Sequence, residues 1–256
     1  MIRLGLIGGK LGHSYSPILH KMLMAEKGID GTYELLELTK DELKCYIDKL
    51  RNGVYHGFNV TIPYKIEIMK YLDEVDDIAK EIGAVNTVYL KDGKVCGTNT
   101  DYYGFKGELE HFRIFPRNKE CYVLGTGGAS LAIKKVLTDM KGFVTRVSRN
   151  SVGKDIISYD ELESKRKIGL LVNTTPVGMY PNMFDCPVSD NVIEVSDTVV
   201  DVIFNPQDTV LVKKSKKGFG GLMMLFLQGV KSEEYWLGTN IEMDTNKMFR
   251  KFKELI

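Results

Sequence analysis

Polar side chains gather at four places within residues 1–101 where an apolar run ends. The segments are residues 13–17 (HSYSP), 59–65 (NVTIPYK), 84–87 (AVNT) and 99–101 (NTD). In an open α/β sheet, ligands bind beyond the carboxyl ends of the strands, so we expect these hydroxyls and amides, one lysine and one aspartate to converge there. Such a set of groups suits a ligand that is rich in hydroxyl groups.

A glycine-rich turn stands in the middle of the chain. Gly125, Gly127 and Gly128 follow an apolar run at residues 121–124 and precede a helical pattern. In that context, backbone N–H groups and the helix dipole can cradle a pyrophosphate. The third consensus position is Ser130 rather than glycine or alanine, and a tight strand-to-helix turn without a nucleotide is the alternative interpretation.

A basic residue ends the strand that is expected after this turn. About twenty residues beyond the glycines, an NAD-specific fold usually places a carboxylate for the ribose 2′-hydroxyl. Here the chain has Ser148, Arg149 and Asn150. A guanidinium at that point can hold a 2′-phosphate through charge-assisted hydrogen bonds. The sequence therefore favours NADP over NAD, with a solvated surface arginine as the alternative.

The elements that would position these side chains form two α/β series. In the first, three strands alternate with helices, and an antiparallel hairpin at the edge is indicated by Asp92-Gly93 between short apolar runs. Ser16, ahead of a proline, is a candidate N-cap. Thr39 and Glu42 have the spacing of a capping box that opens the next helix. The three strands are expected at residues 2–6, 32–38 and 56–62.

The second series starts at the glycine-rich turn. Its strands are expected at residues 121–124, 143–148, 169–173 and 198–204. The last two are unbroken apolar runs of the kind found in buried parallel strands. Helical spacing at residues 222–237 and 241–255 predicts two final helices that return to cover the first series. The sequence thus predicts an α/β chain.

Composition excludes several classes of function. The 256 residues carry 35 Lys and Arg against 34 Asp and Glu, a net charge of +1, so no global field attracts nucleic acid or an anionic membrane. The four cysteines lie far apart, and neither a metal site nor a disulfide framework is expected. The N-terminus does not resemble a signal peptide, and no apolar run approaches the ~18 residues of a membrane span. We expect a cytoplasmic protein with a small-molecule partner.

Taken in order, these motifs resemble the shikimate dehydrogenase family. The family pattern of a Ser-x-Ser-Pro loop, NVT-x-P-x-K, GAVNT and NTD is present at residues 14–17, 59–65, 83–87 and 99–101. The similarity continues through residues 124–130, 148–150, 173–179, 201–206 and 221–228. It spans almost the whole chain, and so many motifs in the right order argue against chance agreement.

The resemblance implies a set of site residues and no metal. Those that would contact shikimate are Ser14, Ser16, Asn59, Thr61, Asn86, Asp101 and Gln228. Those that would hold NADP are Gly125, Thr126, Gly127, Gly128, Ala129, Ser148, Arg149 and Asn150, with Thr174, Gly221 and Met224 near the nicotinamide. Lys65 and Asp101 would serve catalysis. A positioned proton donor accelerates ketone reduction by roughly 10²- to 10⁴-fold, and Lys65, oriented by Asp101, is the natural donor.

The resemblance also implies the architecture and the reaction. Residues 1–101 with 220–256 would form an N-terminal α/β substrate-binding domain, and residues 102–219 a Rossmann-like NADP-binding domain, with the C-terminal helices returning to the first. The expected reaction is the reversible NADPH-dependent reduction of 3-dehydroshikimate to shikimate in aromatic amino-acid biosynthesis. The expected assembly is a monomer or a homodimer.

Two other functions fit parts of the pattern. One is a quinate/shikimate dehydrogenase with relaxed specificity, since Phe204 stands where a family tyrosine often lends a hydroxyl to the substrate carboxylate. The other is a noncatalytic NADP or shikimate sensor. A sensor would lose the proton-transfer pair, whereas Lys65 and Asp101 are both present. Taken singly, Lys65 is also typical of a surface residue at a helix start, and Asp101 of an N-cap.

Overall fold

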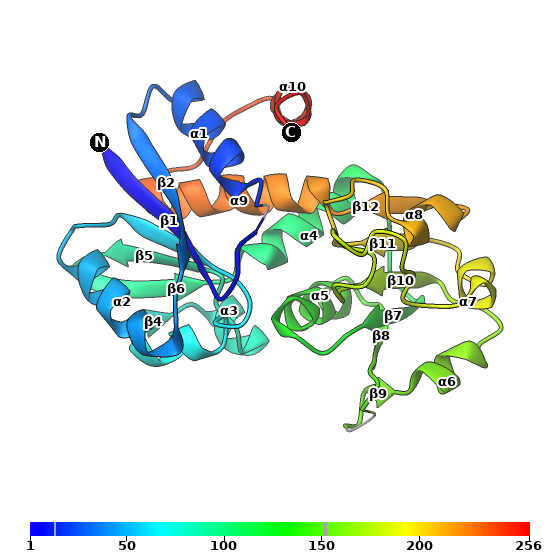
Figure 1. Ribbon diagram of the computed structural model, residues 1–256. Coiled ribbons are helices and arrows are strands. Elements are labelled where there is room, and N and C mark those ends of the chain that lie inside the picture. Colours follow the sequence, from blue (N-terminus) through cyan, green and yellow to red (C-terminus); the bar gives the residue numbers. More distant parts are fainter. Residues whose placement is uncertain (13, 151–152) are drawn as a thin grey trace. The chain divides into compact units, whose positions relative to one another are not determined.

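Two six-stranded sheets, one in each of two units, organise the chain (Figure 1). The structure is a computed structural model that describes residues 1–12, 14–150 and 153–256. Unit 1 comprises Met1–Gly104 and Phe226–Ile256, and unit 2 comprises Phe105–Leu225. The expected α/β class is confirmed. His13, which belongs to the first polar segment of the sequence, lies outside the described residues.

The unit 1 sheet combines parallel strands with a hairpin. In the order β2-β1-β3-β5-β6-β4, it contains β1 (Ile2–Gly8), β2 (Gly31–Glu37), β3 (Gly57–Val60), β4 (Glu74–Val75), β5 (Thr87–Lys91) and β6 (Lys94–Thr98). β1 pairs in parallel with β2 and β3, whereas β5 pairs antiparallel with β3 and β6. Asp92 and Gly93 have φ values of 51° and 76°. Positive φ at both positions is typical of a type I′ turn, so the predicted hairpin is confirmed.

Helices cover both faces of this sheet (Figure 1). The helices of this part of the chain are α1 (Ser16–Glu26), η1 (Lys40–Glu42), α2 (Leu43–Arg51), η2 (Glu67–Tyr71), α3 (Asp77–Ile82), α4 (Thr100–His111), α9 (Leu222–Leu237) and α10 (Thr245–Lys253). Both α4 and α9 include residues of the two units, and α10 contacts α1. The side chains of a strand alternate between faces. Phe58 and Val60 of β3 therefore pack into the apolar core with α2, while Asn59 between them points to the opposite face and bonds to Ser232 of α9. This alternation buries a polar residue against a helix.

The unit 2 sheet is entirely parallel. In the order β12-β11-β10-β7-β8-β9, it contains β7 (Glu120–Leu124), β8 (Phe143–Val147), β9 (Ile156–Ile157), β10 (Leu170–Asn173), β11 (Val199–Asp201) and β12 (Gly218–Gly220). The helices are α5 (Gly128–Asp139), α6 (Tyr159–Glu163), α7 (Asp190–Glu194) and α8 (Val210–Lys214). Numbered from β7, this is the strand order of dinucleotide-binding folds, with a ligand crevice where the order reverses between β7 and β10.

Two expectations about local structure are wrong. Ser16 is not the N-cap, because α1 begins at Ser16 itself with Tyr15 at the cap position. Ser14 Oγ accepts the backbone N–H of Ser16 at 3.2 Å, and the Ser16 hydroxyl makes a tertiary contact instead. The strand expected at residues 198–204 ends at Asp201, because the Asp201 side chain accepts the backbone N–H of Ile203 and turns the chain.

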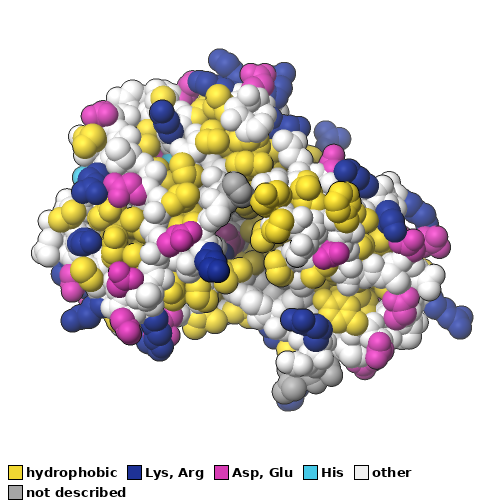
Figure 2. Space-filling view, viewed as in Figure 1, with side chains coloured by type: hydrophobic (Ala, Val, Ile, Leu, Met, Phe, Trp, Pro, Cys, Tyr) yellow, Lys and Arg dark blue, Asp and Glu magenta, His cyan; other side chains and the backbone are white. Residues whose placement is uncertain are grey.

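The surface carries both signs of charge. Figure 2 shows basic and acidic side chains interspersed over the face in view, as the near-zero net charge predicts. Within the described part of the chain, no helix has the length and apolarity to cross a bilayer. The cysteines are free thiols.

Candidate active site

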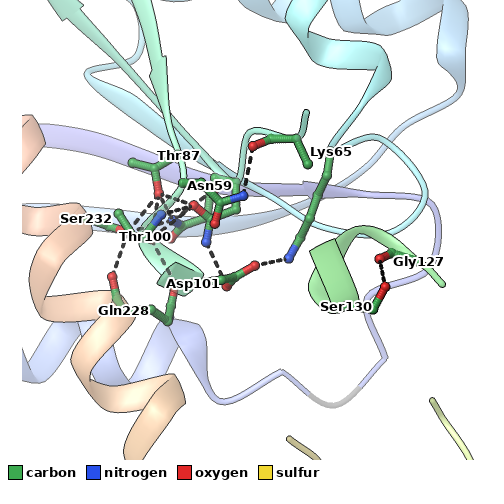
Figure 3. A network of polar contacts seen from close by, with 12 residues as sticks. Asn59, Lys65, Thr87, Thr100, Asp101, Gly127, Ser130, Gln228 and Ser232 are labelled. Atoms are coloured by element: carbon green, nitrogen blue, oxygen red, sulfur yellow. Dashed lines mark hydrogen bonds and ion pairs between the residues drawn. The ribbon is translucent and has the colours of Figure 1, made fainter. Parts of the chain in front are cut away.

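Lys65 and Asp101 form a close ion pair in unit 1 (Figure 3). The Lys65 ammonium donates to Asp101 Oδ2 at 2.5 Å, and the two side chains are 13% and 10% exposed. Lys65 lies in the turn that follows β3, and Asp101 is the second residue of α4. The fold therefore brings into contact the two residues that the sequence selected for proton handling.

Asn86 holds the Asp101 carboxylate from another side. Its Oδ1 accepts the backbone N–H of Thr100 at 2.6 Å, and its Nδ2 donates to Asp101 Oδ1 at 2.8 Å. Because a backbone N–H can only donate, it determines which end of the Asn86 amide is the oxygen. The amide nitrogen must then face Asp101, so the carboxylate accepts one bond from Asn86 and another from Lys65.

Buried amides and hydroxyls form a network behind this pair, here called the polar cluster. Its members, each at most 8% exposed, are Asn59, Asn86, Thr87, Thr100, Gln228 and Ser232. Asn59 Nδ2 donates to Ser232 Oγ at 2.9 Å and to Thr87 Oγ1 at 3.1 Å. Thr100 Oγ1 lies 3.1 Å from Ser232 Oγ and 3.5 Å from Gln228 Oε1. A buried network whose groups are bonded to one another holds its members rigidly, so the bonds of Asn86 give its amide one orientation. Figure 3 shows Asn59, Thr87, Thr100, Gln228 and Ser232 of this cluster close together.

The remaining predicted substrate contacts lie on the same unit. Ser14 precedes α1, Ser16 opens it, and Thr61 directly follows β3. Ser16 is 7% exposed. It reaches the polar cluster through Tyr33, whose hydroxyl bonds to the Ser16 side chain and donates to Asn59 Oδ1 at 2.7 Å.

Four residues of the site were missed by the sequence prediction. Thr87 and Thr100 stand inside the AVNT and NTD motifs, next to residues that were selected. Ser232 follows Gln228 by one helical turn, a spacing that puts the two on one face of α9. Thr87, Thr100 and Ser232 could therefore have been predicted from their motifs and spacing. Tyr33 could not, because only the folded sheet brings β2 to Asn59.

The glycine-rich turn in unit 2 has the geometry of a nucleotide cradle. Gly127 is the N-cap of α5 and Gly128 its first residue. Gly125 has φ of +103°, and an added Cβ there would lie 2.9 Å from the Thr174 hydroxyl, so glycine is required. Ser130, at the third consensus position, is fully buried and donates to Gly127 O at 2.7 Å. The serine thus closes the turn from inside and does not occupy its exposed side, where Thr126 and Gly127 lie.

The predicted 2′-phosphate residues follow β8 directly. Ser148 Oγ accepts the backbone N–H of Asn150 at 3.2 Å, which shapes a tight turn. Arg149 and Asn150 are exposed. Burial raises the pKa of the nearby Tyr159, and the positive charge of Arg149 partly opposes that shift. The Arg149 guanidinium is therefore a solvent-facing cation at the carboxyl end of β8.

A buried carboxyl shapes the loop after β10. Asp201 accepts from Asn173 Nδ2 at 3.0 Å and from Thr209 Oγ1 at 2.8 Å. Asn173 Oδ1 in turn accepts the N–H of Thr175 at 3.0 Å, and Thr174 donates to Leu124 O at 2.5 Å. These bonds hold Thr174 beside the glycine-rich turn. Burial raises the pKa of Asp201 to about 6, against the opposing effect of its hydrogen bonds.

Gly221 and Met224, predicted near the nicotinamide, lie at the start of α9. A Cβ on Gly221 would be 2.3 Å from Val202 O, so only glycine allows this close backbone approach. Met224 is 7% exposed. Its backbone N–H lies beside Glu108, whose pKa burial raises well above the usual value. Across the described ranges, no cluster of three or more His, Cys, Asp or Glu side chains is arranged to bind a metal ion.

Sequence comparisons find relatives over nearly the whole chain. A family model described as shikimate dehydrogenase substrate binding domain matches residues 6–88. A Clostridium beijerinckii protein named shikimate dehydrogenase (NADP(+)) is 42% identical over 245 residues, which cover 91% of this chain and 90% of the relative. A protein of the same name from Methanocaldococcus jannaschii is 36% identical over 273 residues, covering 97% and 96%.

Solved structures share the fold. A chorismate mutase/shikimate 5-dehydrogenase fusion protein from Clostridium acetobutylicum has a TM-score of 0.94 and 38% identity, covering 99% of this chain and 98% of that one. Shikimate 5-dehydrogenase from Thermus thermophilus, in complex with NADP(H) and shikimate, has a TM-score of 0.88 and 29% identity, with full coverage of both chains (100% and 100%).

Gly127→Ala tests the nucleotide cradle. Gly127 has φ of −75° and ψ of −178°, which alanine adopts, and an added Cβ meets no heavy atom within 4 Å. We expect thermal unfolding to show a stability change below about 1 kcal/mol. The methyl group would occupy the space through which a pyrophosphate approaches the backbone, so fluorescence titration should show NADPH affinity reduced roughly tenfold or more. Unchanged affinity would mean that the turn is only structural.

Asp201→Asn tests the buried carboxyl. The pKa of Asp201 is raised from 3.8 to about 6 in the folded protein, so its contribution to stability is present at low pH and is lost as the pH rises through about 6. Between about pH 4 and pH 7, the free energy of unfolding of the wild type, measured by urea unfolding, should fall by on the order of 3 kcal/mol relative to that of the variant. The matched control is exposed Asp208→Asn. A wild-type-to-variant difference that is flat with pH would contradict this assignment.

Proposed function

The chain belongs to the shikimate dehydrogenase family, and we propose how its own residues carry out the family reaction. That reaction is the reversible NADPH-dependent reduction of 3-dehydroshikimate to shikimate, in aromatic amino-acid biosynthesis. We assign substrate binding to unit 1 and NADP binding to unit 2. The observation that carries the proposal is the contact of Lys65 with Asp101, whose carboxylate is held in place by Asn86.

Lys65 is the proton donor in the reduction. When bound, NADPH would supply the hydride for the carbonyl carbon, so the chain's own residues must stabilise the negative charge that develops on the carbonyl oxygen. The Lys65 ammonium donates a proton to that oxygen, and in the oxidation direction the neutral amine takes the proton back from the hydroxyl. A lysine ammonium has three N–H donors. One is held by Asp101, so two remain for the substrate.

Asp101 orients Lys65 and balances its charge. A lysine side chain has many rotamers, and ordering it costs conformational entropy. The carboxylate contact at 2.5 Å orders the Lys65 side chain in the free protein, so this entropy is not lost again when the substrate binds. Because Asn86 fixes the carboxylate in turn, the ammonium is held at one place. Proton transfer depends on such fixed geometry as much as on acidity.

The other groups of unit 1 match a polyhydroxylated acid. We propose that Ser14, Ser16, Asn59, Thr61, Asn86 and Gln228 contact the substrate, together with Asp101. Hydroxyls and amides each both donate and accept, so they recognise hydroxyl groups at defined positions. The Nδ2 protons of Asn59 serve the polar cluster. Tyr33 donates to Oδ1, so one Oδ1 lone pair is left for the substrate.

Unit 2 supplies the NADP-binding groups. We assign the phosphates to the turn Gly125 to Ala129, which leads into α5, because the N–H groups and the dipole of a helix N-terminus favour a phosphate. Arg149 is exposed at the end of β8 and would pair with the 2′-phosphate. These features support the assignment of Ser148, Asn150, Thr174, Gly221 and Met224 to the same nucleotide. The free thiols support our proposal that the enzyme works in the reducing cytoplasm.

Turnover is the direct test of this function. Purified protein mixed with shikimate and NADP should raise the nicotinamide absorbance, because oxidation of the alcohol forms NADPH. Parallel reactions with quinate and with NAD measure how strictly the substrate and cofactor are selected. Failure to turn over shikimate at any pH between about 6 and 10, a range scanned because the rate of proton transfer depends on pH, would overturn the proposal.

Lys65→Ala tests the proton donor. Removal of the ammonium should lower kcat at least ~10²-fold, while the KM for shikimate changes far less, because the lost interaction belongs to the transition state. The matched control is Lys70→Ala, since Lys70 is 63% exposed and pairs with its neighbour Glu67. Equal losses of binding and turnover in Lys65→Ala would make Lys65 a residue that positions substrate instead.

A further inference from the structure

An acid and an imidazole are buried together next to the polar cluster. His20 Nδ1 and Glu233 Oε1 lie 2.7 Å apart, and the two side chains are 0% and 1% exposed. His20 belongs to α1 and Glu233 to α9. In the part of the chain that the structure describes, the other ring nitrogen, His20 Nε2, has no hydrogen-bond partner. The bond to Glu233 is therefore the polar contact that sets the rotation of the imidazole ring.

Stability alone does not explain this pair. Taking both groups out of water costs free energy that their attraction only partly offsets. Well-packed apolar residues at such places are often equally stabilising or more so, whereas a buried polar pair fixes one particular arrangement. The His20–Glu233 pair is therefore expected to fix one arrangement of the side chains around it.

The imidazole sets the plane of the Tyr33 ring. The ring centroids of His20 and Tyr33 are 4.3 Å apart and the planes differ by 6°, a stacked pair. Trp236, one turn beyond Glu233 on α9, closes a second side, 5.2 Å from His20 and 6.4 Å from Tyr33. The indole itself has no room to move toward β3, since a Cβ on Gly57 would lie 2.1 Å from it. Tyr33 is thus held on two sides.

The hydroxyl of Tyr33 ends between two of the proposed substrate contacts. It donates to Asn59 Oδ1 at 2.7 Å and hydrogen-bonds to the side chain of Ser16. Because Oδ1 of Asn59 faces Tyr33, its Nδ2 must face the polar cluster, where it donates to Thr87 and Ser232. Ser16 and His20 also lie four residues apart on α1, so they share one face of that helix. The buried pair and the binding residues are connected by two independent routes.

We propose that the His20–Glu233 pair, acting through Tyr33, positions Ser16 and Asn59 for substrate binding. The inference rests on the proposed function, because it takes Ser16 and Asn59 as shikimate contacts. His20, Glu233 and Tyr33 act through these two side chains, so they are positioning residues. Their loss should weaken shikimate binding and leave NADP binding nearly unchanged, since the nucleotide groups lie on other segments.

The test compares three variants by calorimetric titration with shikimate and, separately, with NADP. Tyr33→Phe keeps the stacked ring and removes the hydroxyl, and Glu233→Leu removes the acceptor of His20. Each should raise the Kd for shikimate roughly 3- to 10-fold, the effect of one hydrogen bond. Glu233→Gln keeps an acceptor and should stay within about twofold of the wild type. The matched control is Tyr55→Phe, because the Tyr55 hydroxyl donates at 2.8 Å to the half-exposed Glu34 and not to a proposed substrate contact.

The outcomes separate this inference from the proposed function. If the wild type binds shikimate and Tyr33→Phe binds it as tightly as Tyr55→Phe does, the positioning role is wrong and the proposed function stands. The positioning role is equally wrong if the Kd values for shikimate and NADP rise together, because that pattern indicates general damage to the fold. A wild type that binds no shikimate would overturn both.

Discussion

The site depends on one hydrogen bond, from the backbone N–H of Thr100 to Asn86 Oδ1 at 2.6 Å. A backbone donor cannot reverse its role, so it fixes the Asn86 amide with the nitrogen toward Asp101. The carboxylate then has one oxygen bound by Asn86 and the other by Lys65. Without that constraint, an amide flip would turn an oxygen toward a carboxylate, and the Lys65 ammonium would lose its fixed partner.

The sheet of unit 1 brings Asn86 and Thr100 close together and buries the hydrogen bond between them. Thr87 follows Asn86 into β5, and Thr100 follows Asn99 into α4, so the two segments that carry the bond are joined by the β5–β6 hairpin. Period-two alternation turns Asn59 and Thr87 to the face that α9 covers, while Phe58 and Val88 fill the apolar core opposite. Burial on that face strengthens each polar bond because water does not compete.

Many of the secondary-structure elements and site residues can be predicted from the sequence, and the others cannot for physical reasons. The hairpin can be predicted because Asp92-Gly93 tolerates positive φ. The parallel strands of unit 2 can be predicted because they are continuous apolar runs. Two-residue strands such as β4 and β9 have no periodicity to detect. Local chemistry favours Ser16 as an N-cap, whereas its side chain bonds to Tyr33 across the fold. A lone hydroxyl such as Ser232 acquires its partners only through tertiary packing.

In the proposed function, Lys65 and Asp101 act as one proton-handling unit. Residues that work as a unit are strongly non-additive, so a cycle of Lys65→Ala, Asp101→Ala and the double variant, read as kcat for shikimate oxidation, tests it most directly. If the two residues act as a unit, the kcat of the double variant should be about as low as that of the more impaired single variant. Losses that multiply, so that the double variant falls by the product of the two single effects, would show that the residues act independently and would contradict this proposal.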